Sequence, residues 1–209
     1  MYKNYSRLEQ LILPPPPKCG VELQTTLLSR KSYRNFSKKP INLSLLSGLL
    51  YYSSGLTMVS KNPKESRRAY PSAGAKYPLE IYVLILQGID IKPGLYHYDL
   101  CAHALEILLL PVLKSEVEPI WKSQRWFRSA AVIFIITAIH KRTTEKYGPE
   151  GTIFPFIEAG HIGQNLYLLA QAYKVGCCAI GQMNEASVCK LLDINPNEEY
   201  PVYYLAIGN

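Results

Sequence analysis

The chain has 209 residues, 48% of them hydrophobic, which is enough to bury one sizeable core, and we expect a single domain. Its 23 Lys and Arg against 16 Asp and Glu give a net charge of +7. Such a balance suits nucleic acid, an anionic cofactor or an acidic substrate, although a solvated basic surface explains it equally well. Nucleic acid is disfavoured because the sequence has no block of five like charges and no zinc-finger, homeodomain or RRM signature.

The five cysteines lack metal-ligand spacing, and we expect reduced core thiols in a cytoplasmic protein. The longest apolar run, residues 130–136, is far shorter than the about 18 residues that a membrane span needs. The N-terminus also lacks the charged and apolar segments of a secretion signal. We therefore expect no membrane partner.

Residues 1–20 include four consecutive prolines, Pro14 to Pro17, which cannot lie inside a helix or a central strand. They favour an extended polyproline conformation. Residues 1–20 are thus predicted to form a proline-rich N-terminal arm, and residues 21–209 the folded domain.

After the arm, residues 21–28 predict a short helix. Apolar residues at helical spacing over residues 41–50 predict an amphipathic helix, which Gly55 caps at its C-terminus. Residues 79–86 then form a nearly continuous apolar run, as expected of a strand that is covered on both faces.

A hairpin is predicted over residues 96–110, followed by a second fully buried strand over residues 130–137. Residues 158–174 have an apolar face of helical period, and Gly176 is expected to end that helix. Residues 202–207 predict a final strand. Helices that flank a mostly antiparallel sheet indicate the α+β class.

Three loop segments contain groups that suit ligand binding. Residues 29–36 gather three cations and several hydroxyls, which can bind a phosphate monoester together, although a solvated basic loop is the alternative. Small residues within 67–77 let backbone N–H groups approach a ligand closely, and a tight structural turn explains them equally well. Residues 179–182, A-I-G-Q, offer backbone for a planar ligand, or form an ordinary loop.

Lys146 and Tyr147 place an ammonium and a phenol side by side. The pair can act as acid and base if the site desolvates the lysine, and a surface lysine beside a core tyrosine is the alternative.

Four polar side chains lie near one face of the long predicted helix, namely Glu158, His161, Gln164 and Asn165. We favour a buried hydrogen-bonded network over direct catalysis for them. A metal is disfavoured because no further ligand stands at metal-binding spacing. Motifs of hydrolases, P-loop NTPases and Rossmann dehydrogenases are also absent from the sequence.

The order of the motifs is more specific than any one of them. From about residue 22 to the C-terminus, the blocks S-R-K-S-Y-R-N-F, R-A-Y-P-S-A-G-A-K-Y-P-L-E-I-Y-V, G-L-Y-H-Y-D, K-Y-G-P, I-E-A-G-H-I-G-Q-N-L-Y-L-L-A, A-I-G-Q and L-A-I-G follow one another. The chain thereby resembles the SagB-type dehydrogenases of the nitroreductase superfamily. The resemblance implies an α+β FMN reductase fold and a homodimer with its flavins at the subunit interface and the helix from Glu158 in the dimer core.

The resemblance also implies the FMN contacts. They are Arg30, Lys31, Ser32 and Arg34 at the phosphate and ribityl chain, Pro71, Ser72, Ala73 and Gly74 of the partner subunit along the ribityl chain and ring, and Ile180, Gly181 and Gln182 facing the ring.

Azoline oxidases of this family convert thiazoline or oxazoline rings of ribosomal peptides to azoles, and a Lys-Tyr pair is implicated in proton abstraction. Lys146 and Tyr147 match that pair. The resemblance implies that Lys146 removes a ring proton with the help of Tyr147, while a hydride leaves to the flavin, which oxygen reoxidises. It also implies a peptide substrate and a cyclodehydratase partner. Alternatives are an NAD(P)H-dependent nitro or quinone reductase, a dehydrogenase of another peptide or cyclic dipeptide, and a non-catalytic flavin-binding scaffold of a cyclodehydratase.

Two segments depart from the family pattern. Many nitroreductases carry a Lys or Arg after the final strand, whereas this sequence ends in Ile207-Gly208-Asn209, so we expect either that other residues hold the phosphate or that it is held more weakly. After Gly148 the sequence reads P-E-G-T-I-F-P-F, where relatives commonly carry arginine and tyrosine. The second departure concerns the substrate rather than the flavin site.

Overall fold

A computed structural model describes residues 2–62, 65–121 and 126–209. Its centre is a seven-stranded sheet with the order β1-β6-β5-β4-β7-β9-β8, in which all neighbouring strands are antiparallel. The strands are β1 (Gln10–Ile12), β4 (Leu79–Ile85), β5 (Gly94–Asp99), β6 (Ala104–Leu109), β7 (Val132–Ala138), β8 (Gly176–Ala179) and β9 (Tyr200–Gly208). A separate hairpin pairs β2 (Leu56–Met58) with β3 (Arg67–Arg68).

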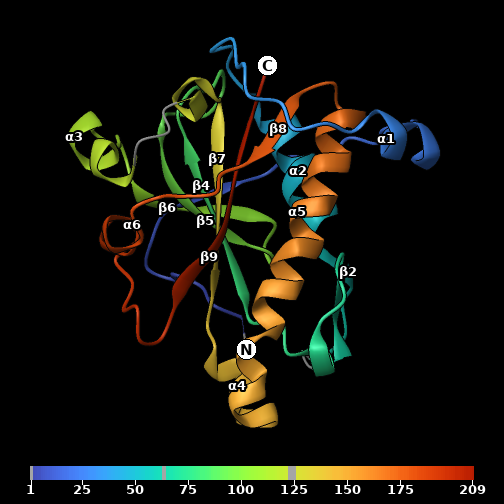
Figure 1. Ribbon diagram of the computed structural model, residues 1–209, viewed down its shortest axis with the longest axis vertical. Helices are drawn as coiled ribbons and strands as arrows, with labels where there is room; N and C mark the ends of the chain where they lie inside the picture. Colours follow the sequence, from blue (N-terminus) through green and yellow to red (C-terminus); the bar gives the residue numbers. More distant parts are fainter. Residues whose placement is uncertain (1, 63–64, 122–125) are drawn as a thin grey trace.

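The α-helices are α1 (Leu23–Ser29), α2 (Leu43–Ser54), α3 (Lys114–Val117), α4 (Lys141–Tyr147), α5 (Phe154–Ala172) and α6 (Glu185–Leu192). Short 3₁₀ turns are η2 (Ala73–Ala75), η3 (Glu118–Ile120), η4 (Trp126–Ser129) and η5 (Gly148–Thr152). Figure 1 shows α2 and α5 along one face of the sheet, with α3 and α6 on the other side. This architecture confirms the α+β class with a mostly antiparallel sheet.

Side-chain chemistry explains where several helices begin. The Asn42 side chain accepts a hydrogen bond from the Leu45 N–H and caps α2, and Asn184 caps α6 in the same way. Helix α5 has a proline in its first turn, where no intrahelical N–H bond is lost.

The sheet separates two apolar clusters. Leu46, Leu49 and Leu166 belong to the cluster beneath α2 and α5, whereas Phe127 and Ile133 belong to the cluster on the opposite face. Strands β4 and β7 are buried along their whole length because both faces are covered. That is the physical reason for the nearly continuous apolar runs in these two strands.

The predicted hairpin, the two buried strands and the final strand are all confirmed, with ends displaced by a few residues. Gly55 also caps α2 as expected. The prediction that Gly176 ends the long helix was wrong: α5 ends at Ala172, because Lys174 turns the chain with φ 60, and Gly176 begins β8. The helix also begins one turn earlier than Glu158, at Phe154.

The N-terminal segment packs on the domain rather than projecting from it, and residue 1 lies outside the described residues. Strand β1 pairs with β6 at the edge of the sheet, which the sequence analysis did not predict. The Pro14 carbonyl accepts a 2.6 Å hydrogen bond from the Ser47 hydroxyl, and the Pro17 carbonyl accepts one of the same length from the Tyr173 hydroxyl. The proline run itself is neither helix nor strand, as its sequence requires.

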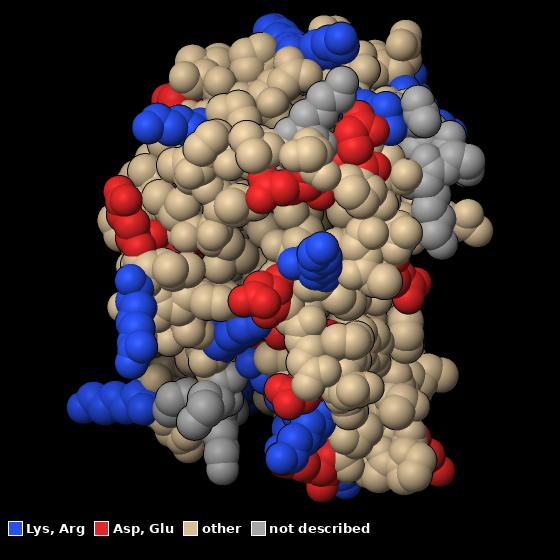
Figure 2. Space-filling model, turned by 90° about the vertical axis from the view of Figure 1, so that its left-hand side faces the viewer, with Lys and Arg blue, Asp and Glu red and all other residues tan. Residues whose placement is uncertain are grey.

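Basic and acidic side chains are interspersed on the face that Figure 2 shows, so positive charge does not gather into one continuous patch there. Within the described ranges 2–62, 65–121 and 126–209, no helix is both long and apolar enough to cross a membrane. Nor do these ranges contain a group of three or more His, Cys, Asp and Glu placed to hold a metal ion.

Candidate flavin site

Residues 71–74, which we call the PSAG loop, are tied to the first half of α5. The buried carboxyl of Glu158 accepts a 2.8 Å hydrogen bond from the Ser72 hydroxyl and a 3.2 Å bond from the Ala73 N–H, both at Oε1. The Ser72 oxygen in turn accepts a 2.8 Å bond from the Tyr77 N–H. Two of these bonds tie the loop to Glu158 and the third ties it to Tyr77, so the loop backbone has a fixed position.

Gly74 brings the PSAG loop against Lys146 and Tyr147. A Cβ atom at Gly74 would lie 2.6 Å from both the Lys146 Nζ and the Tyr147 hydroxyl, which is closer than real Cβ contacts. The residue also has φ +56, a conformation that side chains disfavour. Glycine is therefore needed here, and the fold brings the two predicted catalytic side chains to a loop predicted to contact FMN.

Lys146 and Tyr147 lie in the last turn of α4. The Lys146 Nζ lies 5.0 Å from the centroid of the Tyr147 ring, and that ring packs edge-on against Phe154 with a centroid distance of 5.0 Å. In the single chain Lys146 is exposed and Tyr147 is half-buried. The desolvation that would tune this lysine must therefore come from a ligand or from a second subunit.

Glu158 is set to hold a proton near neutral pH. Burial disfavours its ionised form and raises the pKa of the carboxyl to about 7, although Ser72, Ala73 and the nearby Arg68 favour the charged form. Its Oε2 atom is buried and has no hydrogen-bond partner among the described residues. Unpaired buried oxygen is a further reason for the neutral acid to be favoured.

The basic segment, residues 30–34, lies near the C-terminal half of α5. Tyr167 connects it to β8: its hydroxyl lies 3.2 Å from the Ser32 hydroxyl and accepts a 2.8 Å bond from the Ala179 N–H. The Arg30 guanidinium stacks 5.2 Å above the same ring. Tyr167 thus brings together two segments that the sequence analysis treated separately, and it was missed because it lies outside the apolar stripe that defined the helix.

The donor set of this region fits an anionic ligand. Lys31, Ser32 and Arg34 are exposed, and the Arg34 guanidinium lies 5.9 Å from the Trp126 ring. Several cations and an exposed hydroxyl match the needs of a phosphate monoester.

The loop that follows β8, residues 180–182, has open space beside Gly181. Gly181 and Gln182 are exposed, and a Cβ atom at Gly181 would meet nothing within 4 Å. The Ile180 side chain, by contrast, is 2% exposed and packs in the second apolar cluster. The Ile180 N–H is also engaged, because it donates a 2.9 Å hydrogen bond to the Tyr204 carbonyl, so Gly181 and Gln182 are the exposed residues of this loop.

The two halves of the predicted site lie apart within one chain. Glu158, which holds the PSAG loop, and Tyr167, which holds the basic segment, are nine positions apart on α5, or roughly 13 Å along its axis. One chain therefore presents two separate half-sites.

The other polar residues on α5 divide into two kinds. Asn165 donates 3.2 Å bonds to the Ser53 and Ala69 carbonyls, which fixes the end of α2 beside the strand that leads to the PSAG loop. His161 and Gln164 are exposed instead. The expectation of one buried network is therefore met only in part: Glu158 is buried and Asn165 half-buried, and each bonds to its own partners.

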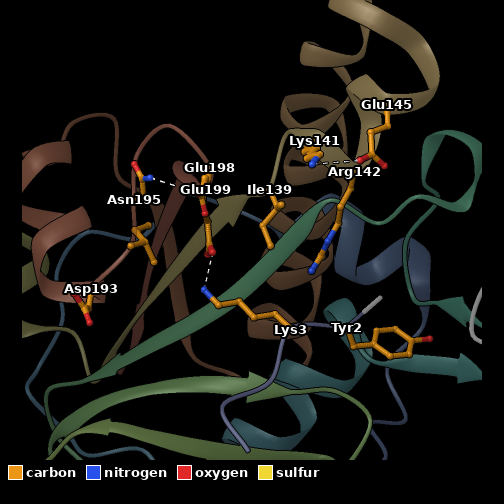
Figure 3. A pocket seen from close by; sticks show the side chains of 11 residues that line it. Tyr2, Lys3, Ile139, Lys141, Arg142, Glu145, Asp193, Asn195, Glu198 and Glu199 are labelled. Carbon is orange, nitrogen blue, oxygen red and sulfur yellow. Dashed lines mark hydrogen bonds and ion pairs between the residues drawn. The ribbon is translucent and has the colours of Figure 1, made fainter.

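A cavity of about 540 Å³ lies elsewhere, between α4, the loop before β9 and the N-terminal residues (Figure 3). None of the predicted flavin contacts lines it. Its buried carboxyl, Glu199, is bonded to Lys3 at 2.6 Å, to Tyr82 at 2.8 Å and to Thr137 at 2.6 Å. Because these three partners satisfy Glu199, its carboxylate is not left free for a ligand.

Comparison with known proteins agrees with the fold and the motifs. The sequence profile of the nitroreductase family matches residues 27–209. A protein of Methanocaldococcus jannaschii described as a nitroreductase is 30% identical over 90% of this chain and 91% of its own length. The crystal structure of a Ralstonia eutropha protein described in the same way superposes with a TM-score of 0.75 at 25% identity, covering 96% of this chain and 89% of that one.

Two further similarities are to proteins of peptide processing. The trifolitoxin-processing protein TfxB of Rhizobium leguminosarum is 25% identical over 75% of this chain, which spans only 44% of TfxB. A chain of the E. coli microcin synthetase complex, solved with a truncated precursor bound, has a TM-score of 0.72 at 21% identity, covering 95% of this chain and 77% of that one. At that identity the second likeness concerns the fold alone. With a family profile that spans nearly the whole folded domain, this chain belongs to the nitroreductase family, whose members are flavin-dependent oxidoreductases.

Proposed function

We propose that this protein is an FMN-dependent dehydrogenase of SagB type that oxidises azoline rings of a peptide to azoles. The contact of Lys146 and Tyr147 with Gly74 carries the proposal, because it places an amine and a phenol at the edge of a loop predicted to line the flavin. An acid-base pair is useful to a dehydrogenase only if it lies beside the hydride acceptor.

FMN suits the chemistry of the site better than a neutral ligand. Arg30, Lys31, Ser32 and Arg34 supply the charge and hydroxyl groups that a terminal phosphate needs. A bound flavin supplies the acceptor for the hydride that leaves the azoline ring. Lys146 takes the ring proton, and the Tyr147 hydroxyl orients the lysine or relays that proton, so that each ring loses one proton and one hydride.

A homodimer would join the two half-sites. Uncovered apolar side chains lie on α1, where Leu23, Leu27 and Leu28 are 64%, 49% and 89% exposed, and around the start of α5, where Ile153, Phe156 and Ile157 are 57%, 54% and 49% exposed. Exposed apolar side chains grouped in this way mark an interface. In a two-fold dimer the PSAG loop of one protomer can lie beside the basic segment of its partner.

The names of two similar proteins support a peptide substrate. TfxB is named for trifolitoxin processing, and the microcin synthetase chain was solved with a peptide precursor bound. A cyclodehydratase that forms the azoline rings is the corresponding partner for this chain.

The test is anaerobic mixing of the purified yellow protein with a thiazoline-containing peptide. We expect the flavin absorbance to bleach in one turnover and the peptide to lose two hydrogens by mass. Lys146→Ala should retain FMN and lose about 10²-fold or more in the bleaching rate, whereas Lys141→Ala, an exposed lysine on the same helix, should behave as the wild type. If Lys146→Ala keeps full turnover, the assignment of Lys146 is wrong.

A second candidate, an NAD(P)H-dependent nitro or quinone reductase, is favoured by the similarity to the M. jannaschii protein. In that case NADH or NADPH alone would bleach the flavin, and a nitro compound or quinone would restore its absorbance. A thiazoline peptide would leave the absorbance unchanged.

A further inference from the structure

Arg142 lies on α4 one turn before Lys146, and its side chain is only 16% exposed. One guanidinium nitrogen, Nη1, donates a 3.1 Å hydrogen bond to the Tyr77 carbonyl, and Nη2 pairs with Glu80 Oε1 at 2.5 Å. Figure 3 shows this side chain extending from α4 toward the sheet. Arg142 therefore fastens α4 to two partners outside its own helix.

The first partner leads directly to the PSAG loop. The N–H group of Tyr77 donates to the Ser72 hydroxyl, while the carbonyl of Tyr77 accepts from Arg142. Tyr77 also has φ 47, so the chain turns sharply between these two bonds. The loop that carries Gly74 and the helix that carries Lys146 are thus both bonded to the backbone of one residue, Tyr77.

The second partner, Glu80, belongs to a buried cluster of three charged side chains in the sheet, Glu80, His97 and Glu106. His97 Nε2 lies 3.2 Å from Glu80 Oε2, and His97 Nδ1 lies 2.7 Å from Glu106 Oε2. His97 and Glu106 are fully buried, and the backbone N–H of Tyr5 covers the other Glu106 oxygen at 2.6 Å. Antiparallel pairing places His97 directly opposite Glu106, so the arrangement is built into the sheet.

Arg142 is the cation that pairs directly with this cluster, and the buried Arg68 also favours the charged form of Glu80. Carboxylates accept but do not donate, so an imidazole that bonds one at each nitrogen is doubly protonated. Burial opposes that charge, but the bonds to Glu106 and Glu80 raise the pKa of His97. One imidazolium and one guanidinium then offset two carboxylates, and removal of Arg142 leaves the buried Glu80 carboxylate without its ion pair, with Arg68 as its remaining guanidinium neighbour.

We propose that Arg142 is a positioning residue that keeps Lys146 and Tyr147 in contact with Gly74. It does so by joining α4 to the Tyr77 carbonyl and to the Glu80–His97–Glu106 cluster. The inference rests on the proposed roles of Lys146 and Tyr147. It adds that their placement depends on a buried charge network in the sheet.

The test compares Arg142→Met, Arg142→Lys and the control Lys141→Met. Lys141 is the adjacent residue, and its pair with Glu145 is exposed. Because Arg142→Met removes the ion-pair partner of Glu80 and can thereby unfold the protein, the double variant Glu80→Gln/Arg142→Met removes both charges together. Folding is checked by the melting temperature and by the flavin content of the purified protein.

The first readout needs no substrate. Competitive acetylation followed by mass spectrometry gives the reactivity of Lys146 relative to Lys190, an exposed lysine on α6. We expect this ratio to rise in Arg142→Met and in the double variant Glu80→Gln/Arg142→Met, and to stay unchanged in Lys141→Met. An unchanged ratio in a folded Arg142→Met protein would overturn the proposal even if the enzyme proves inactive on every peptide.

The second readout is kinetic. We expect kcat for flavin bleaching by the thiazoline peptide to fall about 10- to 100-fold in Arg142→Met with KM nearly unchanged. Arg142→Lys, or guanidinium ion added at a non-denaturing concentration, should restore part of kcat. Loss of flavin without such rescue would make Arg142 a purely structural residue, which contradicts the proposal. Failure of the wild-type protein to turn over any azoline, together with a changed Lys146 reactivity, would instead reject the proposed function alone.

Discussion

The Ser72 hydroxyl donates a 2.8 Å hydrogen bond to Glu158, which is 86 positions further along the chain. The bond joins a loop of small residues to the first half of the longest helix. Because the same carboxyl oxygen also accepts from the Ala73 N–H, two consecutive residues of the loop are fixed. Gly74 is the next residue after Ala73, and it lies against the side chains of Lys146 and Tyr147.

A methyl group at residue 74 should disturb the proposed acid-base pair. In Gly74→Ala the new Cβ would lie 2.6 Å from Lys146 Nζ and from the Tyr147 hydroxyl, so both side chains must move. We expect flavin bleaching to slow by about tenfold or more, because displacements of this size misalign proton transfer. The positive φ should also cost about 1 kcal/mol of folding stability. Gly20→Ala, where the added Cβ meets nothing within 4 Å, is the control, and equal rates for the two variants would refute the expectation.

Replacement of Glu158 should change how stability depends on pH. The pKa of this carboxyl is raised from 4.5 in a reference state to about 7 in the fold. The folded state therefore binds the proton more tightly, and its stabilising effect is complete below about pH 4.5 and lost as the pH rises through 7. Glu158→Gln cannot ionise, so its free energy of unfolding should gain about 3 kcal/mol relative to the wild type between pH 4.5 and 8.

Urea denaturation across that pH range measures the difference between Glu158→Gln and the wild type. A difference that is constant with pH, or that shrinks as the pH rises, would show that Glu158 ionises without penalty. The Gln side chain can still accept from Ser72 and Ala73, so the loop should keep its position.

Removal of the Tyr167 hydroxyl should weaken flavin binding. In Tyr167→Phe the Ala179 N–H and the Ser32 hydroxyl lose their shared partner, and an unsatisfied donor costs about 1 to 3 kcal/mol. We expect the FMN dissociation constant to rise about tenfold, as measured by flavin fluorescence during titration of the apoprotein. Tyr96→Phe also deletes a single 2.8 Å bond, to the Lys92 carbonyl, at a remote turn, and it should bind FMN normally.

A charge on α1 should separate the proposed dimer. Leu28 is 89% exposed in the single chain. In Leu28→Asp, association of the subunits would bury a carboxylate without a partner, which is energetically costly. We expect light scattering to report a dimer for the wild type and a monomer without FMN for the variant. Ile89→Asp, at a residue 69% exposed between β4 and β5, should remain dimeric with full flavin content. A wild-type monomer that retains FMN would contradict the dimeric site.

Local sequence patterns were sufficient to predict those elements whose structure depends on their own segment alone. The apolar runs of β4 and β7, the periodic face of α5 and the cap at Gly55 each depend on neighbouring residues, and all were predicted. Strand β1 was not, because three residues with one half-buried side chain have no pattern of their own, and only the edge of β6 makes them a strand.

By itself, the sequence determined the fold class, most of the elements and the groups that suit a flavin, since these follow from periodicity, turn chemistry and the order of motifs. Only the tertiary structure decided which of those groups meet. It placed Gly74 under Lys146 and Tyr147, gave Tyr167 its bridging role and gathered Glu80, His97 and Glu106 behind Arg142. The physical reason is that hydrogen bonds and ion pairs between distant segments leave no periodic trace along a chain, and they form only after the sheet has aligned its strands.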